Sequence, residues 1–175
     1  MADDRHTAYA TALFAVAKAE GTLDSVEDEL FRFARTLQGN DGLRAALTDA
    51  AVPAARRQQI IEDLLDGKAT PTTTSLVSMI VGTGRAEELP AIIDEMVRLS
   101  ANEVNKEVAE IRSAIELTDD QKQRLAAALE KATGKSVEVK VYVDPSVLGG
   151  VVAQVGDTVI DGSVRHRLDQ LKNQF

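Results

Sequence analysis

The side chains that could carry catalytic chemistry are few and poorly spaced in this chain of 175 residues. There is no cysteine, and His6 and His166 are the two histidines, so a thiolate site is excluded and a histidine-based metal site is disfavoured. Ser163, His166 and Asp169 supply a nucleophile, a base and an acid, but residues three apart are only neighbours along a helix surface. That spacing does not give the linear relay of a catalytic triad, and we interpret Ser163 as a helix cap.

Two short glycine-containing stretches resemble nucleotide-binding loops in part. Residues 134–136 (GKS) lack the earlier glycine of a phosphate-binding loop, because Leu129 stands there, and they follow a helix instead of opening one. Residues 82–84 (GTG) lack the third glycine of a dinucleotide fingerprint, because Glu87 stands there. Both stretches are typical of a helix end, so we expect neither a nucleotide nor another cofactor.

Acidic side chains outnumber basic ones by 28 to 20, which gives a formal net charge of −8. This balance argues against non-specific binding to nucleic acid, whose phosphates need a surface rich in Lys and Arg. The acidic residues Asp24, Glu27, Asp28 and Glu29 could bind a cation, but helix capping and compensation of the helix dipole explain them better. We therefore expect a protein partner, without nucleic acid and without a metal ion.

The beginning of the chain, MADDRHTAYA, resembles neither a secretory signal nor a transit peptide. No run of about 20 apolar residues follows, so the sequence predicts no membrane-spanning helix. These features predict a protein that is made and kept in a cytoplasm-like compartment.

Residues 1–105 have the apolar spacing of consecutive helices. We expect six helices with short connections, which is typical of a compact antiparallel bundle. Asp24 with Glu27 predicts a capping box at the start of the second helix. Pro53 and Pro71 can each open a helix, the fourth and the fifth, at its first position.

From about residue 107 the apolar pattern changes to one typical of strands. Residues 108–117 can form a half-buried strand with Ile115 on its buried side, and residues 136–143 (SVEVKVYV) alternate strictly between apolar and polar side chains. Residues 151–160 contain a Gly-Asp turn between two apolar stretches and predict a β-hairpin.

Two helices are predicted in the same part of the chain. Thr118 and Gln121 predict a capping box for the first of them, whose packing side comprises Leu125, Ala128 and Leu129. Ser163 can cap the second, whose inner side comprises Val164, Leu168 and Leu171. The sequence therefore predicts an α+β protein, mainly α, with a six-helix bundle (1–105) followed by a small α/β domain (106–175) that has a β-hairpin and two helices.

One stretch of the predicted bundle is unusual because it has no charge. Residues 69–84 are 16 uncharged positions in a chain that is 27% charged, and the first helix is apolar nearly all round. Small domains bury only about 60–65% of their surface, so two such helices side by side would leave an apolar groove. Such a groove would suit an amphipathic helix of another protein, whereas two core helices without a groove are an equally open interpretation.

Four stretches together resemble the delta subunit of F-type ATP synthases, called the oligomycin-sensitivity-conferring protein in mitochondria. The C-terminal stretches 144–152 (DPSVLGGVV) and 155–171 (VGDTVIDGSVRHRLDQL) are similar to the signature of that family. Residues 9–21 (YATALFAVAKAEG) resemble its first helix, and residues 76–96 its fifth and sixth. The resemblance covers nearly the whole chain in the right order.

The resemblance implies a non-catalytic stator subunit at the cytoplasmic face of the bacterial plasma membrane, peripheral and in one copy per complex. It implies that the bundle binds the N-terminal helix of an alpha subunit between the first and fifth helices. It also implies that the C-terminal domain binds the ends of the b subunits. Carried over by position, the candidate residues for the alpha-subunit helix are Tyr9, Ala12, Leu13, Val16, Leu76, Met79 and Ile80.

The C-terminal signature suggests two further roles. Its turn and capping residues are expected to be structural; they are Gly149, Gly150, Gly156, Asp161, Gly162 and Ser163. A local basic patch could bind acidic b-subunit segments, although a solvated helix face would explain it equally well; it comprises Arg165, His166, Arg167 and Lys172.

Other classes of function stay open beside the stator. A stand-alone helical adaptor would use the same apolar groove, and an enzyme would need carboxylates converging on a pocket, which nothing in the sequence demands. Some bacterial relatives fuse a b-like segment to this subunit. This chain begins directly at the predicted bundle, so we expect the unfused form.

Overall fold

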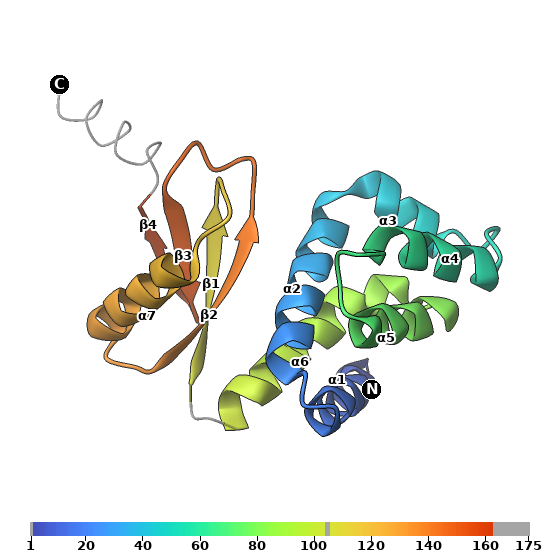
Figure 1. Ribbon diagram of the computed structural model, residues 1–175, viewed down its shortest axis with the longest axis horizontal. Coiled ribbons are helices and arrows are strands. Elements are labelled where there is room, and N and C mark those ends of the chain that lie inside the picture. Colours follow the sequence, from blue (N-terminus) through green and yellow to red (C-terminus); the bar gives the residue numbers. More distant parts are fainter. Residues whose placement is uncertain (1, 104–105, 163–175) are drawn as a thin grey trace. The chain divides into compact units, whose positions relative to one another are not determined.

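Figure 1 shows the computed structural model of the protein, which describes residues 2–103 and 106–162. The chain divides into two compact units, residues 1–100 and 101–175. This division falls slightly before the domain boundary predicted from the sequence, which lies after residue 105. In the described part of the chain no helix is long and apolar enough to cross a membrane.

The first unit is a bundle of helices (Figure 1). The described residues include the six predicted helices, and a short 3-10 helix precedes the sixth. They are α1 (Ala2–Ala19), α2 (Leu23–Gly39), α3 (Asp41–Thr48), α4 (Ala54–Leu65), α5 (Pro71–Gly82), η1 (Ala86–Glu88) and α6 (Leu89–Glu103).

The helix ends follow local chemistry only in part. Pro71 stands at the first position of α5, as predicted, and the Thr70 hydroxyl accepts a hydrogen bond from the Thr73 amide at 3.3 Å. The expectation for Pro53 was wrong by one position, because this proline is the cap that precedes α4. Proline suits both positions, because neither needs a hydrogen bond from its nitrogen.

The predicted capping box of α2 was wrong. The helix begins at Leu23, so Asp24 lies within the first turn and does not cap it. Glu27 is only 1% exposed and lies on the buried side of α2. Asp24 keeps the favourable position of a carboxylate near the positive end of the helix dipole.

The start of α5 is fastened to α2 by one carboxylate. Glu29 Oε2 accepts hydrogen bonds from the Thr70 amide at 2.9 Å, the Thr70 hydroxyl at 2.9 Å and the Thr73 hydroxyl at 2.6 Å. The amides at a helix start have no partner within the helix, so this carboxylate satisfies one of them and also favours the positive helix end. Glu29 thereby fixes where α5 begins.

Apolar side chains from every helix of the bundle make its core. Val26, Leu30, Phe33 and Leu37 form a buried stripe on α2, and the largest fully buried side chains of α6 are Leu89, Ile92, Ile93 and Met96. The helices α4 and α5 approach closely at Gly82, where a Cβ atom would lie 2.5 Å from Gln58 Nε2. Gln58 Nε2 also donates a hydrogen bond to the Ser78 carbonyl at 3.3 Å, which keeps this pair of helices together.

The second unit has a four-stranded sheet in the order β2-β1-β3-β4. Its elements are β1 (Glu107–Ser113), α7 (Asp119–Thr133), β2 (Val137–Val143), β3 (Val151–Val155) and β4 (Thr158–Asp161). The strands β1 and β2 are parallel and α7 connects them, whereas β3 is antiparallel to both β1 and β4. The predicted hairpin is confirmed as β3–β4, and Gly156 in its turn has a φ of +55°. The fold class, α+β and mainly α, is confirmed.

The helix α7 packs on one face of this sheet. Its predicted capping box is confirmed: the Gln121 amide donates to the Thr118 hydroxyl at 3.3 Å, and the Thr118 amide donates to the Gln121 side chain at 2.9 Å. Leu129 is buried among side chains of the three strands β1, β2 and β3, namely Ala109, Ile111, Val137, Ala153 and Val155.

Three expectations for the second unit need correction. The strand β1 ends at Ser113, so Ile115 lies beyond it and is 67% exposed. In α7 the side chain of Ala128 is exposed, and Ala126 packs against the core instead. The alternation of residues 136–143 groups Val143 with Val137, Val139 and Val141, which are buried or half-buried, whereas Val143 ends β2 with 46% of its surface exposed. The helix predicted from Ser163, with Val164, Leu168 and Leu171, lies outside the described residues.

Candidate interaction surface on α1 and α5

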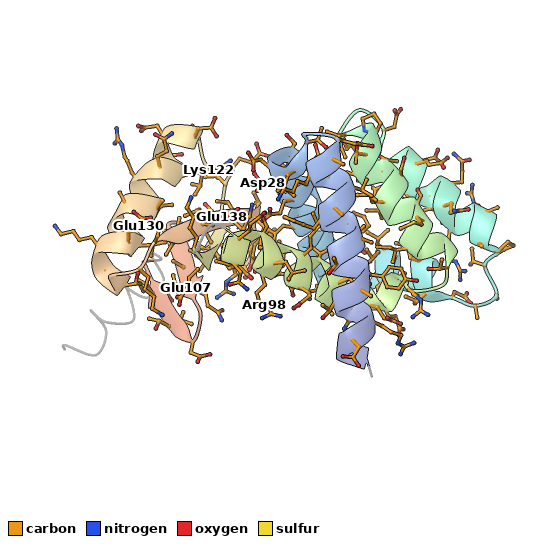
Figure 2. The ribbon with its side chains drawn as sticks, turned by 90° about the horizontal axis from the view of Figure 1, so that it is seen from below. Asp28, Arg98, Glu107, Lys122, Glu130 and Glu138 are labelled. Carbon is orange, nitrogen blue, oxygen red and sulfur yellow. The ribbon has the colours of Figure 1, made fainter. Side chains whose placement is uncertain are left out.

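The helices α1 and α5 lie side by side and run in opposite directions (Figures 1 and 2). At one end of the pair, the Thr72 hydroxyl at the start of α5 donates a hydrogen bond to the Glu20 carboxylate, which follows the end of α1. At the other end, the Arg85 guanidinium lies over the Tyr9 ring, 5.5 Å from its centre. Contacts at both ends therefore hold these helices together.

The two sides of α1 are both uncharged over most of their length. Ala10, Leu13 and Ala17 are buried in the bundle, at 1% exposure or less. Val16 is 40% exposed on the outer side, and four alanines are exposed with it: Ala8, Ala12, Ala15 and Ala19. Because these four side chains are small, another backbone can approach α1 closely over them.

The outer side of α5 is a stripe of uncharged residues four positions apart. Pro71, Ser75 and Met79 are exposed, and 45% of the surface of Met79 is accessible. The inner side of α5 comprises residues with an exposure of 7% or less, namely Thr73, Leu76, Val77, Ser78, Ile80 and Val81. A residue spacing of four places neighbours on one face of a helix, so Ser75 and Met79 share a surface.

The candidate residues for a partner helix divide into two groups. Leu13, Leu76 and Ile80 are 1%, 7% and 0% exposed, so they belong to the core and do not line an open surface. This corrects their assignment, which rested on position alone and could be wrong by one helical turn. Ala12, Val16 and Met79 are exposed, and Tyr9 is half-buried beneath Arg85; they are the candidates that a partner could reach.

We define the α1–α5 face as Ala12, Val16, Ser75 and Met79. Two of its members, Val16 and Met79, are among the exposed large apolar side chains of the first unit. The sequence also predicted Ala12, Val16 and Met79, but it missed Ser75 and Arg85. The spacing of four between Ser75 and Met79 could have identified the serine, whereas the position of Arg85 over Tyr9 depends on contacts between helices.

The Tyr9 end of the α1–α5 face has a small charged network. Arg85 Nη1 donates to Glu88 Oε1 at 3.0 Å, and His6 Nε2 lies 3.4 Å from Glu88 Oε2. Glu88 therefore holds Arg85 in place over the Tyr9 ring. An arginine over an aromatic ring contributes about 0.5–1 kcal/mol at exposed sites, so this network orders the end of the surface more than it stabilises the fold.

The outer side of α6 has an ion pair close to α1. Glu95 accepts hydrogen bonds from Arg98 at 2.9 and 2.6 Å and from the Thr7 hydroxyl at 3.4 Å. The hydrogen bond from Arg98 holds the pKa of Glu95 below its usual value, against an opposing effect of burial. The Thr7 contact fastens the N-terminal half of α1 to α6.

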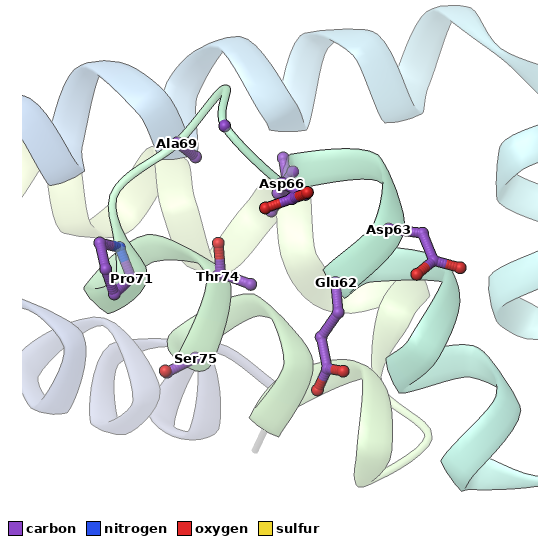
Figure 3. A pocket seen from close by; sticks show the side chains of 9 residues that line it. Glu62, Asp63, Asp66, Ala69, Pro71, Thr74 and Ser75 are labelled. Carbon is purple, nitrogen blue, oxygen red and sulfur yellow. The ribbon is translucent and has the colours of Figure 1, made fainter.

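A cavity of about 570 Å³ lies between the end of α4 and the start of α5 (Figure 3). Glu62, Asp63 and Asp66 are the charged residues of its lining, and Thr74 and Ser75 add hydroxyl groups. A second cavity, of about 360 Å³, is lined from α2, α3, η1 and α6. Among the described residues, no group of three or more His, Asp or Glu side chains could hold a metal ion.

The residues of the C-terminal signature are described up to Gly162. Gly149, Gly150 and Gly156 have φ values of +108°, +78° and +55°, a region that favours glycine. Asp161 ends β4, and the Gly162 amide donates to the Val151 carbonyl at 3.0 Å. The remaining signature residue, Ser163, and the predicted basic patch lie outside the described residues; the patch comprises Arg165, His166, Arg167 and Lys172.

The sequence is similar to one known protein family and to curated proteins. The family described as ATP synthase delta (OSCP) subunit matches residues 6–175. An ATP synthase subunit delta of Streptomyces avermitilis is 44% identical over 159 residues, which are 91% of this chain and 58% of that protein. The subunit delta of Nocardia farcinica is 46% identical over 164 residues, 94% of this chain and 61% of that protein. The chain thus spans about three fifths of the length of these relatives.

The fold is similar to that of a solved structure. One chain in the cryo-EM structure of the Toxoplasma gondii mitochondrial ATP synthase hexamer is similar, with a TM-score of 0.54 and 22% sequence identity. The match covers 97% of this chain and 96% of that chain. At this identity the likeness concerns the fold, and it includes both units.

Proposed function

Because the chain belongs to the family of ATP synthase delta (OSCP) subunits, we propose that it is a non-catalytic stator subunit of F-type ATP synthase. In this role it links the catalytic head to the peripheral stalk, so that proton-driven rotation yields ATP synthesis. The proposed location is the cytoplasmic face of the bacterial plasma membrane, as a peripheral part of the complex.

The observation that carries this proposal is the α1–α5 face. We propose that the N-terminal helix of the alpha subunit lies along it, with apolar side chains against Val16 and Met79 and close approach over Ala12. Burial of one large apolar side chain contributes about 1.5–3 kcal/mol, from which the entropy of association is subtracted. A helix that buries several such side chains can supply the attachment that a stator needs, without any chemistry at this surface.

The second unit is the proposed binding site for the C-terminal ends of the b subunits. Arg165, His166, Arg167 and Lys172 are the proposed contacts, because opposite charges would attract acidic segments. Charge attraction between exposed groups weakens as salt is added. A salt titration of b-subunit binding tests this part, and an affinity that does not fall with ionic strength would exclude the patch.

The stator role can be tested by reconstitution. Membranes of the source organism that are depleted of this subunit should regain attachment of the catalytic head and ATP synthesis when the full chain is added. Ala12→Glu should prevent both, because it places an unpaired charge under the partner helix. Ala55→Glu is the matched control, since it adds the same carboxylate at an exposed alanine in the first turn of α4.

Two results would contradict the proposal. Restoration of ATP synthesis by Ala12→Glu to the level of Ala55→Glu would show that the α1–α5 face is not used. If the wild-type chain failed to attach the head and copurified with unrelated proteins instead, a stand-alone adaptor would explain the surface better than a stator.

A further inference from the structure

We propose that Met79 is an oxidation site, at which a peroxide converts the thioether to a sulfoxide and thereby weakens docking on the α1–α5 face. This inference rests on the proposed function, because the oxidation would weaken binding of the alpha-subunit helix to the same surface. It assigns to the chain a sensitivity to oxidants that the stator role does not require.

The position of the sulfur atoms makes such an oxidation selective. The chain has no cysteine and three methionines, at positions 1, 79 and 96. Met96 lies on the core side of α6 and is 0% exposed, whereas Met79 is 45% exposed. Within residues 2–103 and 106–162, Met79 is therefore the one sulfur that a dissolved oxidant reaches directly.

The surroundings of Met79 allow its side chain to change without disturbing the fold. Its carbonyl accepts a hydrogen bond from the Thr83 amide at 3.2 Å, which belongs to the end of α5 and does not involve the side chain. The neighbouring residues Val77, Ile80 and Val81 fill the core with 0% exposure, while Met79 points away from it. Oxidation thus alters the outer surface of α5 and leaves the buried contacts in place.

The chemistry is balanced with hydrogen peroxide as the oxidant. The sulfur lone pair attacks one peroxide oxygen, the O–O bond breaks and an S–O bond forms. The other oxygen leaves as hydroxide and takes up the proton of the transferred oxygen, which gives water. Sulfur is oxidised by two electrons and the peroxide is reduced by two; the product is a flexible side chain with a polar sulfoxide.

A sulfoxide at this position is unfavourable beneath an apolar partner. Apart from the Ser75 hydroxyl, the α1–α5 face has no polar or charged side chain, so a new sulfoxide oxygen under an apolar helix would lose water and find few hydrogen-bond donors in its place. Because a bound helix would cover Met79, oxidation acts on the subunit before assembly, and assembly protects the sulfur. Oxidative conditions would in this way hold back newly made subunits from joining the complex.

The test uses the full chain and a synthetic peptide with the sequence of the alpha-subunit N-terminal helix from the same organism. Peptide mapping by mass spectrometry after peroxide treatment should find oxidation at Met79 well before Met96. The affinity of the oxidised chain for the peptide should fall by about tenfold, which corresponds to about 1.4 kcal/mol. Prior binding of the peptide should slow the oxidation of Met79.

Met79→Leu is the control variant, because leucine has a similar volume and no sulfur. The affinity of Met79→Leu before peroxide treatment is its own reference, and this affinity should be unchanged after peroxide treatment. Unchanged affinity of the oxidised wild type would overturn the inference and leave the proposed function intact. Loss of affinity in oxidised Met79→Leu, or loss of helical circular dichroism on oxidation, would also overturn it. Failure of the untreated wild type to bind the peptide would refute the proposed function and this inference together.

Discussion

The helices α5 and α6 belong to one bundle and contribute similarly to its core, but their outer sides differ. The outer side of α6 presents the charged residues Asp94, Glu95 and Arg98, two of which form an ion pair. The outer side of α5 presents Ser75 and Met79 and no charge. Charged outer sides keep a helix in water, whereas an uncharged outer side can be covered by another protein without burying a charge. The comparison indicates that α5 contributes both to the fold and to an interaction surface.

The largest expected effect is the difference in stability between substitutions on the inner and the outer side of α5. Ile80→Ala should lower the free energy of unfolding by about 2–5 kcal/mol, because Ile80 is 0% exposed and its truncation leaves a cavity. Met79→Ala, one residue earlier, should change it by less than about 0.5 kcal/mol. Urea unfolding of both variants measures the difference. Equal losses would mean that Met79 belongs to the core and that α5 has no free apolar side for a partner.

A smaller effect is expected where α5 is fastened to α2. Glu29→Ala removes a carboxylate that accepts three hydrogen bonds from Thr70 and Thr73, and it should cost about 1–3 kcal/mol of stability. Glu62→Ala removes an exposed carboxylate from α4 and serves as the control, with an expected change below about 0.5 kcal/mol. If Glu29→Ala unfolds at the same urea concentration as Glu62→Ala, the hydrogen bonds of Glu29 to the start of α5 do not contribute to the stability of the fold.

The smallest effect concerns the charged outer side of α6. The folded pKa of Glu95 is lowered, so its ion pair contributes stability that is present above the ordinary carboxyl pKa and is lost as the pH falls through the folded pKa. An ion pair between residues three positions apart on a helix should contribute about 0.5 kcal/mol or less to the free energy of unfolding. Thermal unfolding of the wild type and of Glu95→Gln should therefore differ at neutral pH and converge in acid. If the two proteins still differ in unfolding temperature in acid, the effect of the substitution comes from packing and not from the ion pair.

The sequence could predict what depends on near neighbours. The capping box at Thr118 and the position of Pro71 were correct, because the interacting groups lie within one helical turn. The same rule failed at Asp24, since α2 begins at Leu23 and Glu27 is drawn into the core. Two helix starts were possible at this position, and the packing of the bundle selects one of them. A local sequence pattern cannot make that choice.

The candidate site was predicted less well than the helices that form it. The absence of charge in residues 69–84 identified α5, but Leu13, Leu76 and Ile80 turned out to be core residues. A helix that is uncharged all round has no charged side to mark its orientation, and in α5 both buried and exposed positions include hydroxyl residues, so the buried side follows only from its neighbours. The end of β1 was missed for a similar reason, because Ile115 continues the alternation after the pairing with β3 has stopped at Ser113.

The central claim is that the α1–α5 face binds the alpha-subunit helix, and a titration of that peptide against Met79→Glu tests it most directly. Ala55→Glu, with the same added charge on α4, is titrated beside it, and circular dichroism checks that both variants remain folded. We expect Met79→Glu to bind at least about tenfold more weakly than Ala55→Glu, because the new carboxylate would be buried without a partner. Equal affinities of the two folded variants would contradict the account.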